Sequence, residues 1–350
     1  MKIDKHIEVV RSGVPRLSSM GLKSCNMIAE VLSKYYRHVD ITYVNNPHDL
    51  ACLIDKKPDL AFIGFKSMPS IHRGIQISDD IWMSEELDKS GINYTGSTKE
   101  AMVLDHNKDV AKQVIQAAGL PTAPYFCASP GEYRTIESLP LGFPLFVKPP
   151  REGGGIGIDD DSIVRSFGAY KQKVATIRDV FGTHSLVEKY LAGREFSVAF
   201  LETWPNEGLL AMPIELISEP GKHGDRILSR KIKSDDSEHV TAVAPGPLRD
   251  TLNHLATSAF KAIGGRDYGR IDIRMDEAGE LYFLEANLIP GLAMHDFTSY
   301  FTSACWINRA IDYDAMVLGI VKLGLMREQR HTEDIPASNM AVDASVLSLK

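Results

Sequence analysis

The sequence lacks the features that mark several broad classes of protein. Its four cysteines (positions 25, 52, 127 and 305) are far apart and form no C-x-x-C pair, which argues against a disulfide framework and against a zinc site. No uncharged apolar stretch approaches the roughly 18 residues of a membrane-spanning helix, and the first ten residues lack the apolar segment of a secretory signal. The net charge is −7 with no run of five like charges, which argues against a nucleic-acid-binding surface. We therefore expect a soluble, cytoplasmic protein that binds neither nucleic acid nor a membrane.

The length and composition are those of a multidomain globular protein. The chain has 350 residues, of which 44% are hydrophobic and 24% charged, so two or three domains are expected. Residues 1–97 alternate strand and helix patterns, which is typical of a parallel sheet covered by helices. We expect an N-terminal α/β domain over 1–97, a central subdomain over 98–190 and a C-terminal subdomain with a metal site over 191–326. The remaining segment, 327–350, has no periodicity and is expected to be a tail.

A hairpin predicted over residues 269–287 carries the most informative polar pattern. With a four-residue loop at 276–279, both arms alternate apolar and polar residues, so that Met275 pairs with Glu280. One face then carries Arg270, Asp272, Glu285 and Asn287. In this register Asp272 and Glu285 are diagonal neighbours, about 7–8 Å apart. Two carboxylates and an amide oxygen suit Mg²⁺, and the alternative is a solvated face with an Arg270–Glu285 pair.

A glycine-rich loop follows an apolar strand that ends at Lys148. The loop contains Gly153, Gly154, Gly155 and Gly157, and it can turn backbone N–H groups toward an anion without interference from Cβ atoms. Its spacing matches neither the P-loop nor the Rossmann fingerprint. Lys148 would be a point-charge partner for a bound phosphate. The alternative is a loop without a ligand beside a solvated lysine.

Together these segments resemble ATP-grasp enzymes, specifically D-alanine–D-alanine ligase, from about residue 94 to about residue 297. The matching stretches are Asn93–Ser97, Ala118–Pro124, Val147–Pro149 with Arg151–Gly153, Val187–Leu191, Arg194–Phe196, and Leu284–Asn287 with Pro290 and Gly291. The resemblance implies an α/β protein with an ATP-grasp fold and an N-terminal Rossmann-like, pre-ATP-grasp domain built on a parallel sheet.

The resemblance also implies roles, position by position. Lys108 and Lys148 match lysines that contact ATP phosphates, and Lys231 matches a further phosphate lysine of the catalytic machinery. The hinge that holds adenine matches Glu188, Lys189, Tyr190 and Leu191, and the ribose-binding acid matches Glu195. Arg270 matches the arginine at the reacting acyl centre, while Gly154 and Gly155 stand in the lid loop. Asp272, Glu285 and Asn287 match the ligands of Mg²⁺, or of Mn²⁺ in its place.

The implied reaction joins a small carboxylic acid to an amine through an acyl phosphate, with release of ADP and phosphate. Several segments depart from the family pattern, among them Gly64–Pro69 and the glycine loop, and two departures fall directly on the substrate positions. No acidic residue stands between Val9 and Ala29 to hold an ammonium group, and Arg11 occupies that loop instead. Asp296 and Phe297 replace the serine–leucine pair that receives a carboxylate. We therefore expect amino-acid-like, non-standard substrates of specialised metabolism and consider a homodimer. The alternatives are a housekeeping D-alanine–D-alanine ligase and an inactive nucleotide-binding homologue.

Overall fold

The computed structural model describes residues 1–327 except 15–16, 73–74, 77–79, 204–207, 222–223, 236 and 295–298. The α-helices are α1 (Leu22–Tyr35), α2 (Pro47–Asp55), α3 (Met83–Lys89), α4 (Lys99–His106), α5 (Lys108–Ala117), α6 (Phe167–Phe181), α7 (Arg230–Asp235), α8 (Pro247–Ile263), α9 (Tyr300–Arg309) and α10 (Tyr313–Leu325). Two 3₁₀ turns are η1 (Ile136–Ser138) and η2 (Asp160–Ser162). Among the described residues, no helix has both the length and the apolar character needed to cross a bilayer.

The strands form three main sheets. They are β1 (Ile3–Arg11), β2 (Tyr36–Tyr43), β3 (Leu60–Ile63), β8 (Tyr125–Ala128), β9 (Leu145–Lys148), β10 (Ile163–Val164), β11 (Ser185–Lys189), β12 (Glu195–Thr203), β13 (Gly208–Ile217), β14 (His239–Ala242), β15 (Tyr268–Met275) and β16 (Leu281–Asn287). Four two-residue strands, β4 (Ser67–Met68), β5 (Ile71–His72), β6 (Ile75–Gln76) and β7 (Ile81–Trp82), pair as β4–β7 and β5–β6.

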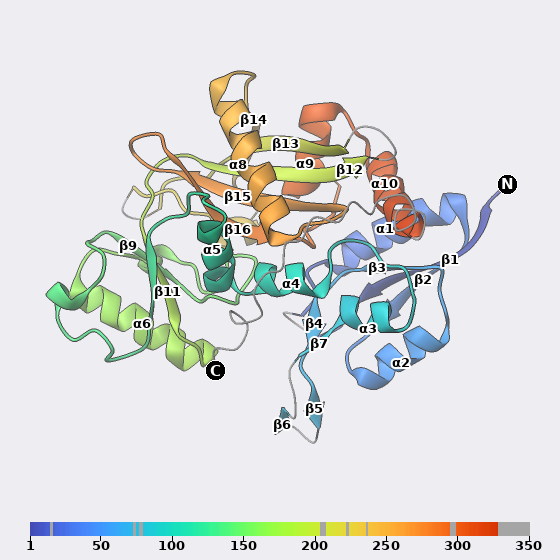
Figure 1. The fold of residues 1–350 in the computed structure, drawn as a ribbon, viewed down its shortest axis with the longest axis horizontal. Helices are drawn as coiled ribbons and strands as arrows, with labels where there is room; N and C mark the ends of the chain where they lie inside the picture. The colour runs from blue at the N-terminus through green and yellow to red at the C-terminus, as the bar shows by residue number, and fades with distance from the viewer. Residues whose placement is uncertain are drawn as a thin grey trace.

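The first sheet has the parallel order β2-β1-β3, so the parallel sheet expected in residues 1–97 is confirmed. Its centre is apolar, because Ile7, Val9 and Val10 of β1 are fully buried. Parallel strands need crossover connections. Helix α1 connects β1 to β2, and α2 connects β2 to β3. In Figure 1 this part of the chain is blue and lies to the right.

The second sheet, with the antiparallel order β10-β9-β11-β8, forms a lobe with its own core. Leu145, Val147 and Val187 are fully buried against Tyr170 and Ile177 of α6. Helix α6 begins where Ser166 accepts a hydrogen bond from the backbone N–H of Ala169, and it ends at Gly182 with φ +69°. Figure 1 shows this lobe in green at the left.

The third sheet has the order β14-β13-β12-β15-β16 and is antiparallel throughout. Helices α8 and α9 cover it, and its core is continuous with that of the first sheet. Figure 1 shows it above the other two sheets, with α4 and α5 passing between. Arg327, the last described residue, packs against this body and lies 2.7 Å from Asp267. The rest of the predicted tail lies outside the described residues.

The predicted register of the β15–β16 hairpin was wrong in two places. Met275 pairs with Leu281 instead of Glu280, because the connection is one residue longer and closes with an Asp276 N–H to Glu280 C=O bond of 2.9 Å. A β-bulge then follows, so that Asp272 faces Glu285 and leaves Leu284 as the extra residue. The two one-residue shifts add to two, which restores the predicted face. The carboxylates are therefore directly opposite each other rather than diagonal.

Candidate active site

A cleft opens between the second and third sheets. One part of its lining is apolar and includes Phe146, Ile158, Tyr190, Leu191, Ile227 and Leu228. The other part is charged and includes Lys148, Glu188, Lys189, Glu195, Lys233, Asp272, Arg274 and Glu285. A ligand with a flat apolar portion and a charged portion fits such a cleft.

The four polar residues of the hairpin face, which we call the hairpin cluster (Arg270, Asp272, Glu285 and Asn287), lie together at the charged end. Asp272 is held from three sides. Arg270 Nη1 donates to its carboxylate oxygens at 2.8 and 3.0 Å, Ser197 Oγ donates at 2.7 Å, and Asn287 Nδ2 donates at 3.1 Å. The guanidinium of Arg270 also lies 5.0 Å from the ring centroid of Tyr300. These contacts fix the rotamers of the cluster before any ligand arrives.

The charge around the hairpin cluster is strongly positive. Lys108 Nζ lies 3.4 Å from Glu285 Oε2. Burial opposes ionisation of Glu285, but Lys108, Lys148 and Lys233 outweigh it and hold the pKa of this carboxyl well below its usual range. Burial raises the pKa of Asp272, with Arg270 opposing. The carboxylate can bind a cation, and the surrounding lysines can bind the phosphates that accompany that cation.

The donor set of the hairpin cluster fits Mg²⁺. Asp272 and Glu285 are opposed across one strand pair, and Asn287 is close enough to donate to Asp272. All the available donor atoms are carboxylate and amide oxygens, which this ion prefers, and it commonly takes one or two carboxylates together with substrate phosphates. Asp272, Glu285 and Asn287 would hold it.

Lys148 belongs to a buried charge network beneath the cleft. Glu188 lies 2.7 Å from Lys148 Nζ and 2.6 Å from Lys112 Nζ, and all three side chains are at most 5% exposed. Burial disfavours the charge of Glu188, but the two lysines lower its pKa overall. Lys112 also donates to Thr122 Oγ1 at 2.7 Å. Sequence analysis missed Lys112, although its place with Lys108, Ala111 and Ile115 on the buried face of α5 was a usable signal.

The predicted adenine hinge lies along one wall of the cleft. The backbone N–H of Lys189 donates to the Pro124 carbonyl at 2.9 Å, and that of Tyr190 donates to the Pro144 carbonyl at 3.2 Å. Glu188, by contrast, turns its side chain into the buried network. Backbone anchoring of this kind holds the wall in position for a ligand.

Arg274 ties this hinge to the third sheet, and it was also missed. Its Nε donates to the Leu191 carbonyl at 2.6 Å, its Nη1 lies 2.7 Å from Glu195 Oε2, and its Nη2 donates to the Arg226 carbonyl. Burial raises the pKa of Glu195, with Arg274 opposing. The alternation of the strand, which puts Arg270, Asp272 and Arg274 on one face, was the available signal.

The glycine loop lies beside α7 at the mouth of the cleft. Gly154 and Gly155 have φ values of +61° and +76°, which favour glycine. A Cβ on Gly155 would lie 2.9 Å from the backbone N of Arg230, so this approach also requires glycine. Lys108 Nζ donates to the Glu152 carbonyl at 2.7 Å and links the loop to α5.

The phosphate lysine predicted at position 231 is better placed two residues further on. Lys233 lines the cleft and lies near Tyr300, with Nζ 5.8 Å from the ring centroid, whereas Lys231 is exposed. Residues two apart on a helix point about 200° apart, so only one of these lysines can face the cleft. The geometry favours Lys233.

The predicted substrate residues are not brought to the cleft by the described part of the structure. Arg11 ends β1 with its guanidinium 5.1 Å from the ring centroid of Tyr43, and it is not among the residues that line the cleft. Asp296 and Phe297 lie outside the described residues.

Comparison with known proteins gives one consistent result. The family described as "D-ala D-ala ligase C-terminus" matches residues 114–322. A D-alanine–D-alanine ligase of Marinobacter nauticus is 33% identical over 239 residues, which are 67% of this chain and 68% of that protein. A D-alanine–D-alanine ligase of Trichlorobacter lovleyi is 29% identical over 293 residues, 82% of this chain and 86% of the relative.

Solved structures agree on the fold. The D-alanine–D-alanine ligase of Bacillus anthracis complexed with ATP has a TM-score of 0.69 at 20% identity, covering 93% of this chain and 99% of that one. The ligase of Coxiella burnetii has a TM-score of 0.66 at 17% identity, with 94% and 96% covered. The predicted ATP-grasp fold is thereby confirmed. The chain belongs to the D-alanine–D-alanine ligase family, whose members are ATP- and Mg²⁺-dependent, ADP-forming carbon–nitrogen ligases.

Proposed function

We propose that the protein forms D-alanyl–D-alanine from two D-alanine molecules at the expense of ATP. The observation that carries the chemistry is the meeting of three oxygen donors (Asp272, Glu285 and Asn287) with three lysines (Lys108, Lys148 and Lys233) at the charged end of one cleft. The substrate assignment rests on the relatives, which are named D-alanine–D-alanine ligase and which this chain matches over two thirds or more of their length.

The reaction follows from the charges of the cleft. The carboxylate of the first D-alanine attacks the γ-phosphorus of ATP, the bond to the β-phosphate oxygen breaks, and ADP leaves. The amine of the second D-alanine attacks the acyl carbon of the resulting acyl phosphate, loses a proton and expels phosphate from a tetrahedral intermediate. Lys108, Lys148 and Lys233 offset phosphate charge, while Arg270 donates hydrogen bonds where charge develops. Bound Mg²⁺ would supply further charge neutralisation at the transferring phosphoryl group.

The cleft also has means of protecting the acyl phosphate from water. The glycine loop, with Gly154 and Gly155 at its turn, packs against the start of α7, the helix that carries Lys233 of the cleft lining. We assign the loop the role of a lid, because closure over a reactive intermediate limits its hydrolysis. The hinge backbone at 189–191 would bind adenine beside Tyr190, and Glu195 would contact the ribose.

The expectation of non-standard substrates gains no support from the comparisons, and the housekeeping alternative replaces it as our proposal. Arg11, one of the residues that motivated that expectation, lies against Tyr43 and is not among the residues that line the cleft. Assembly as a homodimer stays a prediction, which sedimentation velocity would check.

The test is turnover with D-alanine, ATP and Mg²⁺, followed by phosphorus NMR and mass spectrometry. We expect ADP, phosphate and D-alanyl–D-alanine, with kcat/KM of about 10⁴ M⁻¹s⁻¹ or more. AMP and pyrophosphate would contradict the acyl-phosphate chemistry. ADP release with a different acid and amine, but none with D-alanine, would contradict the substrate assignment alone.

A further inference from the structure

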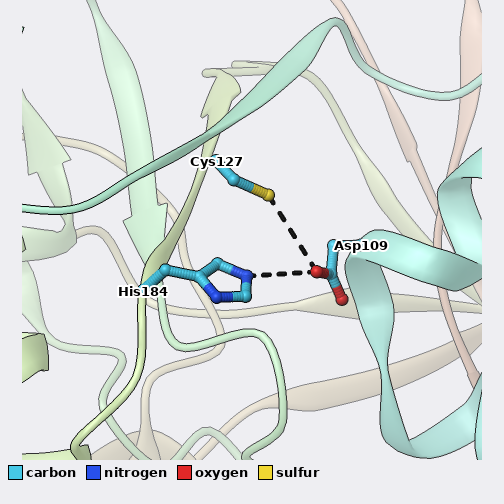
Figure 2. A group of neighbouring side chains, drawn as sticks. All are labelled: Asp109, Cys127 and His184. Carbon is cyan, nitrogen blue, oxygen red and sulfur yellow. Dashed lines mark hydrogen bonds and ion pairs between the residues drawn. The ribbon is translucent and has the colours of Figure 1, made fainter. Parts of the chain in front are cut away.

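A second group of potential ligands lies outside the cleft. Asp109 in the first turn of α5, Cys127 on the edge strand β8 and His184, just before β11, converge on one point. We call these three residues the α5 cluster. Figure 2 shows the thiol and the imidazole both directed at the carboxylate, which reaches them from the helix. The three residues are separated by 18 and 57 positions in the sequence, so only the fold brings them together.

The spacing of the ligand atoms suits one metal ion. His184 Nε2 lies 3.1 Å and Cys127 Sγ 4.0 Å from the same oxygen, Asp109 Oδ2, and all three ligand atoms lie within 4.8 Å of one another. A tetrahedral zinc ion with bonds of about 2.0 Å to nitrogen and oxygen and about 2.3 Å to sulfur separates such ligands by roughly 3.3–3.6 Å. Small side-chain rotations would therefore close the α5 cluster around an ion.

We propose that Asp109, Cys127 and His184 bind a divalent transition metal, with Zn²⁺ as the best match and water completing the coordination. Sulfur and imidazole nitrogen are ligands of zinc and its neighbours, whereas Mg²⁺ takes oxygen. The α5 cluster is thus chemically distinct from the hairpin cluster. The absence of a C-x-x-C pair argued against a zinc site at the level of the sequence. That argument applies only to ligands that are close together along the chain, which these three are not.

The surroundings of the α5 cluster admit an ion. The side chain of His184 is 32% exposed and that of Asp109 is 15% exposed, so solvent reaches the ligands. The hydrogen bond that the imidazole of His184 donates to Asp109, aided by Cys127, raises the pKa of His184 to about 9. The ion therefore competes with a proton, as metals at histidine and cysteine sites do in general.

A metal here would fasten the nucleotide-facing elements together. Asp109 directly follows Lys108, which contacts Glu285, and His184 directly precedes β11, which carries Glu188. Cys127 is paired with Leu186 across β8 and β11. One ion would tie the start of α5 to the edge of the second sheet, behind the cleft.

The experiment is a Co²⁺ titration of the full chain after dialysis against a chelator. Co²⁺ replaces Zn²⁺ at such sites and gives a thiolate-to-metal charge-transfer band only when sulfur is a ligand. We expect the band to saturate at one equivalent and to disappear on addition of Zn²⁺, while a large excess of Mg²⁺ leaves it unchanged.

Two variants and one control make the result specific. Cys127→Ser should abolish the band. His184→Gln should keep it but require at least about tenfold more Co²⁺, since even outer groups at metal sites change affinity by 10–100-fold. Cys52→Ser is the matched control, because Cys52 is exposed and lies 3.8 Å from His48 without a third ligand in the described structure. A folded wild-type chain without the band would overturn the proposal, as would a band lost in Cys52→Ser but kept in Cys127→Ser.

Discussion

The hairpin cluster and the α5 cluster bring potential metal ligands together in different ways. In the hairpin cluster, Asp272 and Glu285 are opposed on paired strands, Asp272 is buried, and Lys108 lies 3.4 Å from Glu285. In the α5 cluster, sulfur, nitrogen and oxygen come from three separate segments and remain partly exposed. The first arrangement serves a hard cation that arrives with phosphates. The second suits a softer cation that binds without phosphates. Both clusters contain carboxylates, so the other donor atoms distinguish the two sites.

Lys112 links α5 to β16, the two elements that carry residues of the two clusters, and its loss should have the largest effect. It lies one helical turn after Asp109, and its Nζ is 3.4 Å from the Phe283 carbonyl on β16 and 2.6 Å from Glu188. Lys112→Met removes one partner of a buried carboxylate, which should lower the free energy of unfolding by about 3–5 kcal/mol. Urea denaturation measures this loss. Lys34→Met is the control, because its pair with Asp314 is exposed and should contribute far less to the free energy of unfolding. Equal midpoints for the two variants would contradict the prediction.

Arg270 tests whether the hairpin cluster is the catalytic one of the pair. Arg270→Ala should lower kcat by about 10²–10³, the loss typical of one electrostatic donor, because no other group in the cluster replaces its guanidinium beside Asp272. Steady-state assays of ADP release measure it. Arg194→Ala is the matched control, since Arg194 lies just before β12 of the same sheet, is 48% exposed and pairs with Glu215. The Co²⁺ band of the α5 cluster should be unchanged in both variants, and a full-rate Arg270→Ala enzyme would remove the distinction.

Zinc should stabilise the fold through the α5 cluster. At a free concentration of 100 times Kd, a ligand that binds only the folded state adds about 2.7 kcal/mol to the free energy of unfolding. We expect this gain in the wild-type chain and about half of it or less in His184→Gln, whose affinity for the metal is at least about tenfold lower. Urea denaturation with and without Zn²⁺ measures both gains. The same concentration of Mg²⁺ should give no difference between the two chains. An equal zinc effect in both would assign the stabilisation elsewhere.

The two clusters also differ in how far the sequence predicts them. Alternation along the hairpin predicts its polar face, and the face survives a wrong register because a shift of two residues preserves alternation. The bulge at Leu284 was not predictable, since no residue type there requires it. Local patterns also predict the parallel sheet and the glycine turn at Gly155. The α5 cluster and the Lys112–Glu188 pair depend on contacts between distant segments, which no local period encodes.

Lys233 and Lys231 test which lysine of α7 contributes to the positive charge around the hairpin cluster, and the expected effect is the smallest of those predicted. Lys233 lines the cleft and helps to lower the pKa of Glu285, whereas Lys231 is exposed on the same short helix. Lys233→Met should raise KM for ATP by about tenfold, which corresponds to about 1.4 kcal/mol, because one phosphate partner is lost. Lys231→Met should leave KM within about twofold, since Lys231 is not among the residues that line the cleft. Both variants keep an unbranched side chain, one atom shorter, and remove one charge, so net charge cannot explain a difference between them. The opposite ranking would return the phosphate contact to Lys231 and would mean that α7 turns its other face to the nucleotide.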